Sequence, residues 1–128
     1  MSGEFQDKTL LLVDDDKDIL ASMEAALGDL GAKVLSATDG NTALEQAQEN
    51  EPDVVVLDMM LPKRSGFLVM EKLKSGKKRG DRPQIIMITG NRGVRHKDYA
   101  ESLGVSAYLN KPFRMEKLVE TVRGLLEG

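Results

Sequence analysis

Near the N-terminus the chain reads TLLLVDDD over residues 9–16, a short aliphatic run that stops abruptly at three aspartates. A run this short does not fill a helix, and its aliphatic character is typical of a buried strand. A similar run over residues 54–57 is followed by Asp58, and another over residues 84–88 is followed by Thr89. The sequence therefore predicts buried strands that end in polar residues.

Amphipathic stretches alternate with these runs. Apolar residues recur at spacings of three and four over 17–30, which predicts a helix. Weaker or shorter patterns predict the remaining elements: strands over 33–37 and 107–109, and helices over 41–49, 67–73, 94–103 and 115–126. Strands that alternate with helices in this way predict an α/β fold, a doubly wound five-stranded parallel sheet with helices on both faces.

Length and composition describe an ordinary globular chain. With 128 residues, 41% of them hydrophobic and 30% charged, we expect a single domain over 1–128 with its core at about 8–126. The segment before residue 8 is polar, and no apolar run approaches the roughly 20 residues of a membrane span. We therefore expect a cytoplasmic protein without a membrane segment.

Several residue types are rare or absent. Without cysteine the chain has no disulfides, thiolate metal sites or thiol nucleophiles. The only histidine, His96, excludes multi-histidine metal sites, and its basic, polar neighbourhood indicates a solvated side chain. With no Trp and only 3 Phe and 2 Tyr, an aromatic platform for nucleic acid is not expected, so we predict no direct nucleic-acid binding.

Charge is distributed unevenly along the chain. The net charge is −3, but residues 1–62 hold 14 acidic and 3 basic side chains, whereas residues 63–97 hold 2 acidic and 11 basic ones. Such a division is compatible with a site that handles phosphate or cations, and equally with solvated faces. For the basic stretch, solvated loops are the favoured interpretation.

The residues that follow the predicted strands share a chemistry. Asp14 to Asp16, Asp58, Thr89 and Lys111 all fall at the carboxyl ends of strands, which meet at one edge of a parallel sheet. Crowded carboxylates repel one another unless a cation lies among them, and Mg²⁺ prefers such oxygen ligands. With a hydroxyl and an ammonium nearby, one aspartate could act as nucleophile and form an aspartyl phosphate.

Four motifs at these strand ends resemble the receiver (CheY-like) domain of two-component response regulators. They are LVDDD at 12–16, VLDMMLP at 56–62 with Ser65-Gly66, ITG at 88–90 and YLNKPF at 108–113. The resemblance covers nearly the whole chain, with the motifs in the family's order. It implies a signalling switch that is phosphorylated and dephosphorylated on its own aspartate, and not an enzyme that turns over an external substrate.

The resemblance also implies residue roles. Asp58 would accept a phosphoryl group from a phosphohistidine in a Mg²⁺-dependent reaction. Asp15 would bind the Mg²⁺ directly and Asp14 mainly through water, while Asp58 and the backbone carbonyl of Met60 would complete the protein ligands.

Three further residues gain roles from the same family pattern. Thr89 and Lys111 would hold phosphoryl oxygens, so that together with Asp58 they form the catalytic set. Tyr108 would be the switch aromatic that turns inward as Thr89 moves toward the phosphate. The peptide bond between Lys111 and Pro112 would be cis, an uncommon state for an X–Pro bond.

Partners follow from the family as well. A sensor histidine kinase or a histidine phosphotransfer protein would dock near the first helix and the loop after Lys111, and a downstream effector protein or domain would read the output. No effector is encoded in these 128 residues, so we expect a stand-alone receiver or one excised from a longer regulator or hybrid kinase. Ser106 and Ala107 stand where transcription factors of the family usually have acidic residues that support a dimer, so a monomer or weak dimer is expected.

Other functions fit the motifs less well. A phosphatase of the haloacid-dehalogenase type, with Asp14 as nucleophile, needs Thr or Val where Asp18 stands, and also a cap domain. An EF-hand loop starting at Asp14 needs Gly and Glu where Ile19 and Ala25 stand. Flavin binding is disfavoured because no hydroxyl-rich loop follows the first strand.

Two positions near the predicted site affect the expected lifetime of the phosphoryl group. The thioether of Met60 cannot orient an attacking water as an amide or a carboxylate could, although Asn91 could partly compensate. The sequence therefore predicts a moderately long-lived acyl phosphate.

Overall fold

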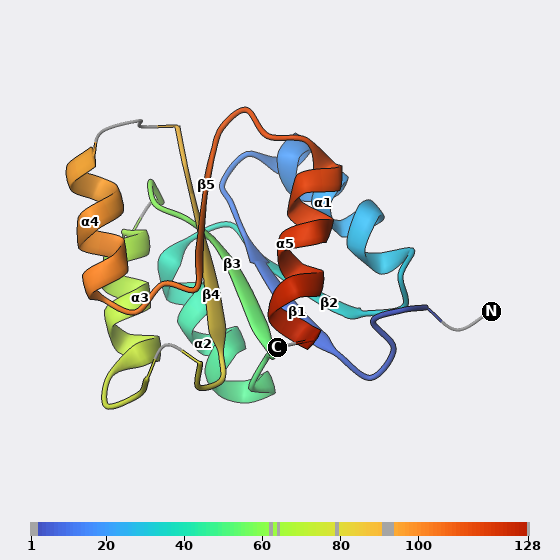
Figure 1. The fold of residues 1–128 in the computed structure, drawn as a ribbon, viewed down its shortest axis with the longest axis horizontal. Helices are drawn as coiled ribbons and strands as arrows, with labels where there is room; N and C mark the ends of the chain where they lie inside the picture. Colours follow the sequence, from blue (N-terminus) through green and yellow to red (C-terminus); the bar gives the residue numbers. More distant parts are fainter. Residues whose placement is uncertain (1–2, 62, 64, 79, 91–93, 128) are drawn as a thin grey trace.

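The computed structural model describes residues 3–61, 63, 65–78, 80–90 and 94–127, in which five strands alternate with five helices (Figure 1). In chain order they are β1 (Thr9–Val13), α1 (Lys17–Gly28), β2 (Lys33–Ala37), α2 (Gly40–Asn50), β3 (Val54–Asp58), α3 (Gly66–Lys74), β4 (Gln84–Thr89), α4 (Val94–Ser102), β5 (Ala107–Asn110) and α5 (Met115–Glu127). Every predicted element is confirmed, with bounds that differ by at most two residues.

The strands form one parallel sheet in the order β2-β1-β3-β4-β5. This is the predicted doubly wound arrangement, because the chain moves outward from β1 to β2 and then crosses back to β3. In the register of the sheet, Asp58 lies opposite Ile88, and Thr89 lies opposite Asn110. The polar residues that end β3, β4 and β5 therefore share one edge.

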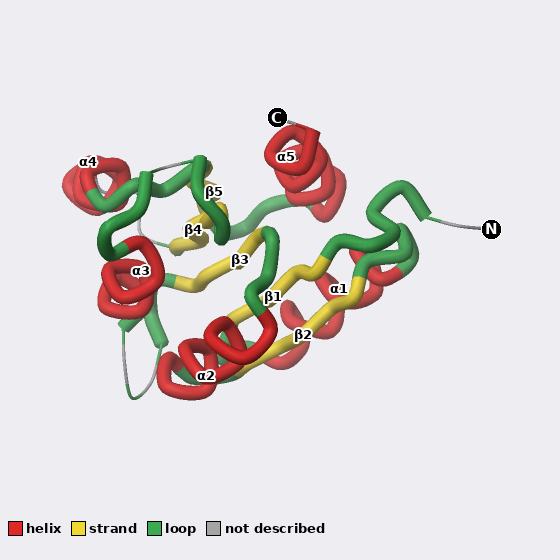
Figure 2. The backbone as a smooth tube through the Cα atoms, turned by 90° about the horizontal axis from the view of Figure 1, so that it is seen from below, coloured by secondary structure: helices red, strands yellow, loops and turns green. Residues whose placement is uncertain are grey.

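The core consists of two layers, one on each face of the sheet. Successive side chains of a strand point to opposite faces. Leu11 and Val13 accordingly pack with α2 and α3, whereas Leu10 and Leu12 pack with α1 and α5. Figure 2 shows α2 and α3 on one side of the twisted sheet and α5 on the other. Helices on both faces bury the sheet, which explains why the inner strands β1 and β3 are almost entirely aliphatic.

Three helices begin at side-chain caps that the sequence supplies. Asp16 accepts hydrogen bonds from the backbone N–H groups of Asp18 and Ile19 at the start of α1. Asp39 and Ser65 cap α2 and α3 in the same manner. Each cap satisfies N–H groups that the helix itself leaves unpaired. Asp16, the last of the three aspartates, is thus a helix cap.

A segment that the sequence analysis treated as merely polar contributes to the core. Phe5 is only 2% exposed and belongs to the core layer of α1 and α5. Its backbone N–H donates to the carbonyl of Leu30 at 2.8 Å, and Glu4 forms an ion pair with Arg123 of α5. The start of the described chain is therefore fixed to the ends of α1 and α5.

Few of the described side chains of helix α4, those of residues 97–102, are buried. Among its described side chains, Ala100 is buried, whereas Tyr99 is 45% exposed and touches Phe67 of α3 edge-on, with ring centroids 4.9 Å apart. Lys97, Asp98 and the following polar residues face solvent. The poor apolar periodicity of this segment in the sequence thus corresponds to limited packing of its described side chains against the rest of the protein.

Across the residues described, no helix combines the length and the apolar character that crossing a bilayer would require.

Candidate functional site

Three aspartates meet at the carboxyl edge of the sheet. Asp14 and Asp15 follow β1, and Asp58 ends β3. One carboxylate oxygen from each lies within 4.8 Å of the others. Asp14 is fully buried and Asp58 is 4% exposed, whereas Asp15 faces solvent. The predicted convergence of these carboxylates is therefore present.

A lysine from the loop after β5 partly neutralises the negative charge of this cluster. The Lys111 ammonium lies 3.0 Å from Asp14 Oδ2 and 3.2 Å from Asp58 Oδ2. Its backbone N–H donates to the carbonyl of Thr89 at 2.7 Å, which fixes the loop after β5 to the end of β4. The ammonium thus bridges the two buried carboxylates and reduces their mutual repulsion.

The electrostatics of the cluster show that this neutralisation is incomplete. Burial raises the pKa of Asp58, and the Asp14 carboxylate raises it further, while the Met60 N–H bond and Lys111 act against this. Burial disfavours the charged form of Lys111, but its contacts with Asp14 and Asp58 outweigh burial and raise its pKa. The ionised Asp58 is therefore costly in the folded protein, and an additional cation at the cluster would relieve that cost.

The donor set fits a hard divalent cation. All three side chains offer carboxylate oxygens, which suit Mg²⁺ better than they suit softer metals. Asp15 is exposed, so one ligand faces solvent, from which the remaining water ligands of Mg²⁺ would come. The Met60 backbone lies next to the cluster, because its N–H donates to Asp58 Oδ1 at 3.1 Å.

The two predicted switch residues are neighbours. Thr89 is fully buried at the end of β4, and Tyr108 lies on β5, the adjacent strand. The Tyr108 hydroxyl is buried, and burial raises its pKa, an effect that the nearby Thr89 side chain partly offsets. The aromatic ring is partly buried against the layer formed by α2 and α3. Thr89 thus lies between the acidic edge and this aromatic side chain.

Gly66, which the sequence analysis quoted only as part of the family motif, has a steric role beside the site. Gly66, the first residue of α3, donates its backbone N–H to the Met59 carbonyl at 2.9 Å. A Cβ atom there would lie 2.3 Å from the Asp58 carbonyl oxygen and 2.8 Å from Met59 Cα. The sequence signal was its place in the Ser65-Gly66 motif, which does not by itself show that another backbone approaches closely.

Replacing Gly66 by Ala is expected to lower the free energy of unfolding by about 1–3 kcal/mol, the usual range for overpacking. The new methyl group would push against the backbone of Asp58, so metal binding at the cluster should weaken as well. Urea unfolding with and without Mg²⁺ measures both effects. Gly124→Ala is the control, because nothing lies within 4 Å of that Cβ position in α5, and it should stabilise the chain by about 1 kcal/mol. Equal stabilities of the two variants would contradict the prediction.

Some predicted features lie beside the cluster or outside the described residues. The Lys111–Pro112 peptide bond is cis, and so is the Arg82–Pro83 bond, which the sequence analysis did not anticipate. Asn91 lies outside the described residues, as does the side chain of His96, so the expectations for them stay predictions.

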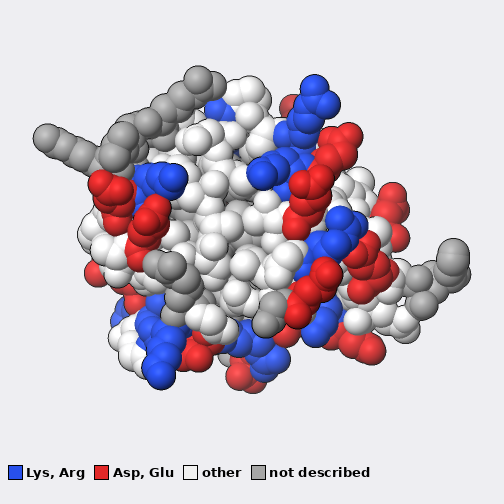
Figure 3. Space-filling view, viewed as in Figure 1, with Lys and Arg blue, Asp and Glu red and all other residues white. Residues whose placement is uncertain are grey.

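The basic stretch lies mostly at the opposite end of the sheet. Lys77 and Lys78 are exposed, whereas Lys74 is buried and its ammonium donates to the carbonyls of Asp81 and Pro83. On the face drawn in Figure 3, blue basic side chains at the rim are interspersed with red acidic ones. Much of the basic character is thus solvated or used within the loop before β4, in agreement with the favoured interpretation.

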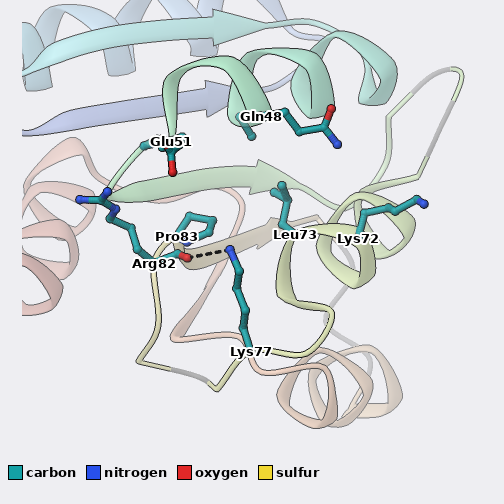
Figure 4. A pocket seen from close by; sticks show the side chains of 9 residues that line it. Gln48, Glu51, Lys72, Leu73, Lys77, Arg82 and Pro83 are labelled. Atoms are coloured by element: carbon teal, nitrogen blue, oxygen red, sulfur yellow. Dashed lines mark hydrogen bonds between the residues drawn. The ribbon is translucent and has the colours of Figure 1, made fainter.

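A groove of about 280 Å³ occupies that same end, between α2 and the loop before β4. Figure 4 shows that the Lys77 ammonium points at the Arg82 carbonyl, 3.1 Å away. Arg82 also lies 3.4 Å from Asp53. Pro52 and Pro83, which line the groove, precede β3 and β4, whereas Asp58 and Thr89 end these strands. The groove is therefore separate from the acidic cluster.

Comparison with known proteins agrees with the fold. The family model described as the response regulator receiver domain matches residues 10–123. The chain belongs to the response regulator receiver family. Response regulator MprA of Mycobacterium sp. (strain KMS) is 37% identical over 117 residues, which cover 91% of this chain and 50% of MprA. The probable transcriptional regulator ycf27 of Cyanophora paradoxa is 37% identical over 123 residues, 96% of this chain and 50% of its own length.

Solved receiver structures have the same fold. A putative response regulator from Chloroflexus aurantiacus superposes with a TM-score of 0.84 at 31% identity, covering 94% of this receiver and 98% of that chain. The chemotaxis response regulator CheY4 of Vibrio cholerae gives 0.83 at 29% identity, covering 92% and 98%. This receiver spans about half the length of the curated relatives it matches.

Proposed function

We propose that the chain is a phosphoacceptor switch of a two-component system in which Asp58 carries the phosphoryl group. The observation that supports this most directly is the meeting of Asp14, Asp15, Asp58 and Lys111 at one edge of the sheet. Asp58 differs from Asp14 because it ends its strand beside Thr89, the hydroxyl predicted to hold a phosphoryl oxygen. Asp14 is 0% exposed whereas Asp58 is 4% exposed, so of the two buried carboxylates Asp58 is the one with some access to solvent.

The reaction that this arrangement supports is a transfer between two side chains. An Asp58 carboxylate oxygen attacks the phosphorus of a phosphohistidine; the P–N bond breaks, and its electron pair remains on the imidazole, which takes up a proton. Asp14, Asp15, Asp58 and the Met60 carbonyl would hold Mg²⁺, which when bound offsets negative charge on the phosphoryl oxygens.

Lys111 and Thr89 would respond to the new group. The Lys111 ammonium, now between two carboxylates, is close enough to Asp58 to pair with a phosphoryl oxygen instead. Thr89 would donate its hydroxyl to another phosphoryl oxygen and move toward it. The space next to Tyr108 would change with that movement, and the surface formed by β5 and α4 would present a different shape to an effector.

The donor and the reader of this signal are proposed from the family. A sensor histidine kinase or a histidine phosphotransfer protein would supply the phosphoryl group in the cytoplasm, through contacts near α1 and the loop after Lys111. An effector domain, in this protein or in another, would bind the phosphorylated form.

Trapping the phosphoryl adduct tests this proposal. The chain is incubated with phosphoramidate and Mg²⁺, the acyl phosphate is reduced with borohydride, and the modified residue is located by peptide mass mapping. We expect modification at Asp58, and none when EDTA replaces Mg²⁺. Modification at Asp14 would instead favour phosphatase-type chemistry, and the absence of any adduct would contradict the proposal.

Mg²⁺ should also stabilise the fold without any phosphodonor. At ten times its dissociation constant it is expected to add about 1.4 kcal/mol to the free energy of unfolding, because it binds only the folded cluster. Asp15→Asn should remove most of this gain. Asp29→Asn, an exposed carboxylate at the far end of α1, is the control and should retain it. Thermal unfolding over a Mg²⁺ titration gives the answer, and an unchanged gain in Asp15→Asn would refute the assignment.

A further inference from the structure

One methionine differs from the rest in its exposure. The Met60 side chain is 69% exposed. The other methionines among the described residues are buried or partly buried: Met23, Met59, Met70, Met87 and Met115. Oxidation of methionine to the sulfoxide follows the accessibility of the thioether. A peroxide in solution should therefore react with Met60 before it reacts with these others.

The position of Met60 makes such a modification relevant to the site. Its backbone N–H donates to Asp58 Oδ1 at 3.1 Å, and the preceding Met59 N–H donates to the Ile88 carbonyl at 2.9 Å. The exposed thioether is thus carried by backbone that is bonded both to the proposed phosphoacceptor and to the neighbouring strand. It is exposed two residues after Asp58, at the edge of the sheet that carries the acidic cluster.

We propose that Met60 is a peroxide-sensitive site whose oxidation shortens the lifetime of the phosphoryl group on Asp58. This inference rests on the proposed function. In the oxidation step, the Met60 sulfur gives two electrons to hydrogen peroxide and takes one oxygen atom, and water leaves. A methionine sulfoxide reductase that uses a thiol pair as reductant restores the thioether and releases the oxygen as water.

The chemical reason is a change in hydrogen-bonding capacity. A thioether sulfur is a weak acceptor, whereas a sulfoxide oxygen carries a strong partial negative charge. Such an oxygen at the rim can accept a hydrogen bond from water and orient it toward the phosphorus. Because the Met60 carbonyl belongs to the backbone, the same oxidation leaves the proposed metal ligand unchanged, so the affinity for Mg²⁺ should stay the same.

The test separates modification from its consequence. The chain is treated with increasing hydrogen peroxide, and peptide mass mapping gives the order in which the methionines are oxidised. Each sample is then phosphorylated with phosphoramidate and Mg²⁺, freed of the donor, and followed as the phosphoryl group is lost. We expect Met60 to be oxidised before the other methionines that the structure describes and the loss to become about fivefold faster, the effect of roughly one net hydrogen bond.

Two variants of the same residue complete the design. Met60→Leu keeps an apolar side chain without a thioether, so peroxide should not change its phosphoryl lifetime. Met60→Gln carries an amide oxygen near the position of the sulfoxide oxygen, so its phosphoryl group should be lost quickly without peroxide.

Several results would overturn the inference. If another of the described methionines is oxidised before Met60, the inference fails whatever the phosphorylation assay shows. An unchanged lifetime in the oxidised chain, or an equal acceleration by peroxide in Met60→Leu, would also overturn it. If the untreated chain takes up no phosphate at all, the proposed function itself fails, and the proposed effect on phosphoryl lifetime fails with it. The order of methionine oxidation would still show whether Met60 is the peroxide-sensitive residue.

Discussion

Asp58→Asn is expected to abolish phosphoryl uptake and at the same time to make the receiver more stable in Mg²⁺-free buffer at neutral pH. Uptake is lost because the amide replaces the attacking carboxylate oxygen. Stability rises because burial and the Asp14 carboxylate already raise the pKa of Asp58, so its ionised form costs folding free energy. Uptake should fall to the level of a sample without phosphodonor, and Tm should rise by a few degrees.

The pH dependence of this gain has a definite sign. Asp58 has a higher pKa in the folded protein than its ordinary value of 3.8, so the folded state binds more protons between those two values. Its contribution to stability is most favourable below 3.8 and is lost as the pH rises through the raised pKa. The advantage of Asp58→Asn should therefore be largest at neutral pH and shrink as the pH approaches 4.

Asp53→Asn is the matched control, because Asp53 precedes β3 at the opposite end of the strand. Its carboxylate accepts a hydrogen bond from the Thr9 N–H at 2.9 Å and lies 3.4 Å from Arg82. That variant should take up phosphate normally and lose about 1 kcal/mol of stability. If both variants lost stability equally, the unfavourable charge ascribed to Asp58 would be disproved.

Phe5→Ala is expected to lower the free energy of unfolding by about 3–5 kcal/mol, as for other fully buried aromatic residues. That loss is a large share of the roughly 5–15 kcal/mol by which a domain is stable. The side chain is 2% exposed in the layer between the sheet and the α1 and α5 helices. Urea unfolding, analysed as a two-state transition, measures the loss.

Two further variants show whether the cost comes from the buried ring. Phe5→Leu keeps most of the apolar volume and should lose less than about 1.5 kcal/mol. Glu4→Gln breaks the ion pair with Arg123, but both side chains are more than a third exposed, so the loss of stability should be much smaller than in Phe5→Ala. A loss below 1 kcal/mol in Phe5→Ala would mean that residues 3–8 are dispensable for the core.

The sequence predicted the elements and the cluster for a common physical reason. Aliphatic runs such as residues 54–57 have strong local patterns, and the polar residue after each run is carried to a known edge once the strands are parallel. Asp14, Asp58, Thr89 and Lys111 therefore could be assigned to one place without coordinates. Only their order along the chain and the sheet topology were needed.

What the sequence did not yield depends on contacts between distant segments. Phe5 is an isolated aromatic residue in a polar segment, and its burial depends on how α1 and α5 leave space for it. The requirement for glycine at position 66 comes from the close approach of the backbone at Asp58, which no local pattern encodes. In the sequence, Lys74 likewise resembles the exposed lysines near it, although its ammonium donates hydrogen bonds to the carbonyls of Asp81 and Pro83.

The limited packing of the described side chains of α4 has a thermodynamic consequence for signalling. A helix that inserts few side chains into the protein interior can be displaced at little cost, because little apolar surface becomes wet when it moves. Two arrangements of that helix would then differ by only a small free energy. A modest change in preference, such as one created by a single phosphoryl group, would be sufficient to exchange their populations. The limited burial of the described part of α4 thus makes this helix a place where a small chemical input would have a large mechanical effect.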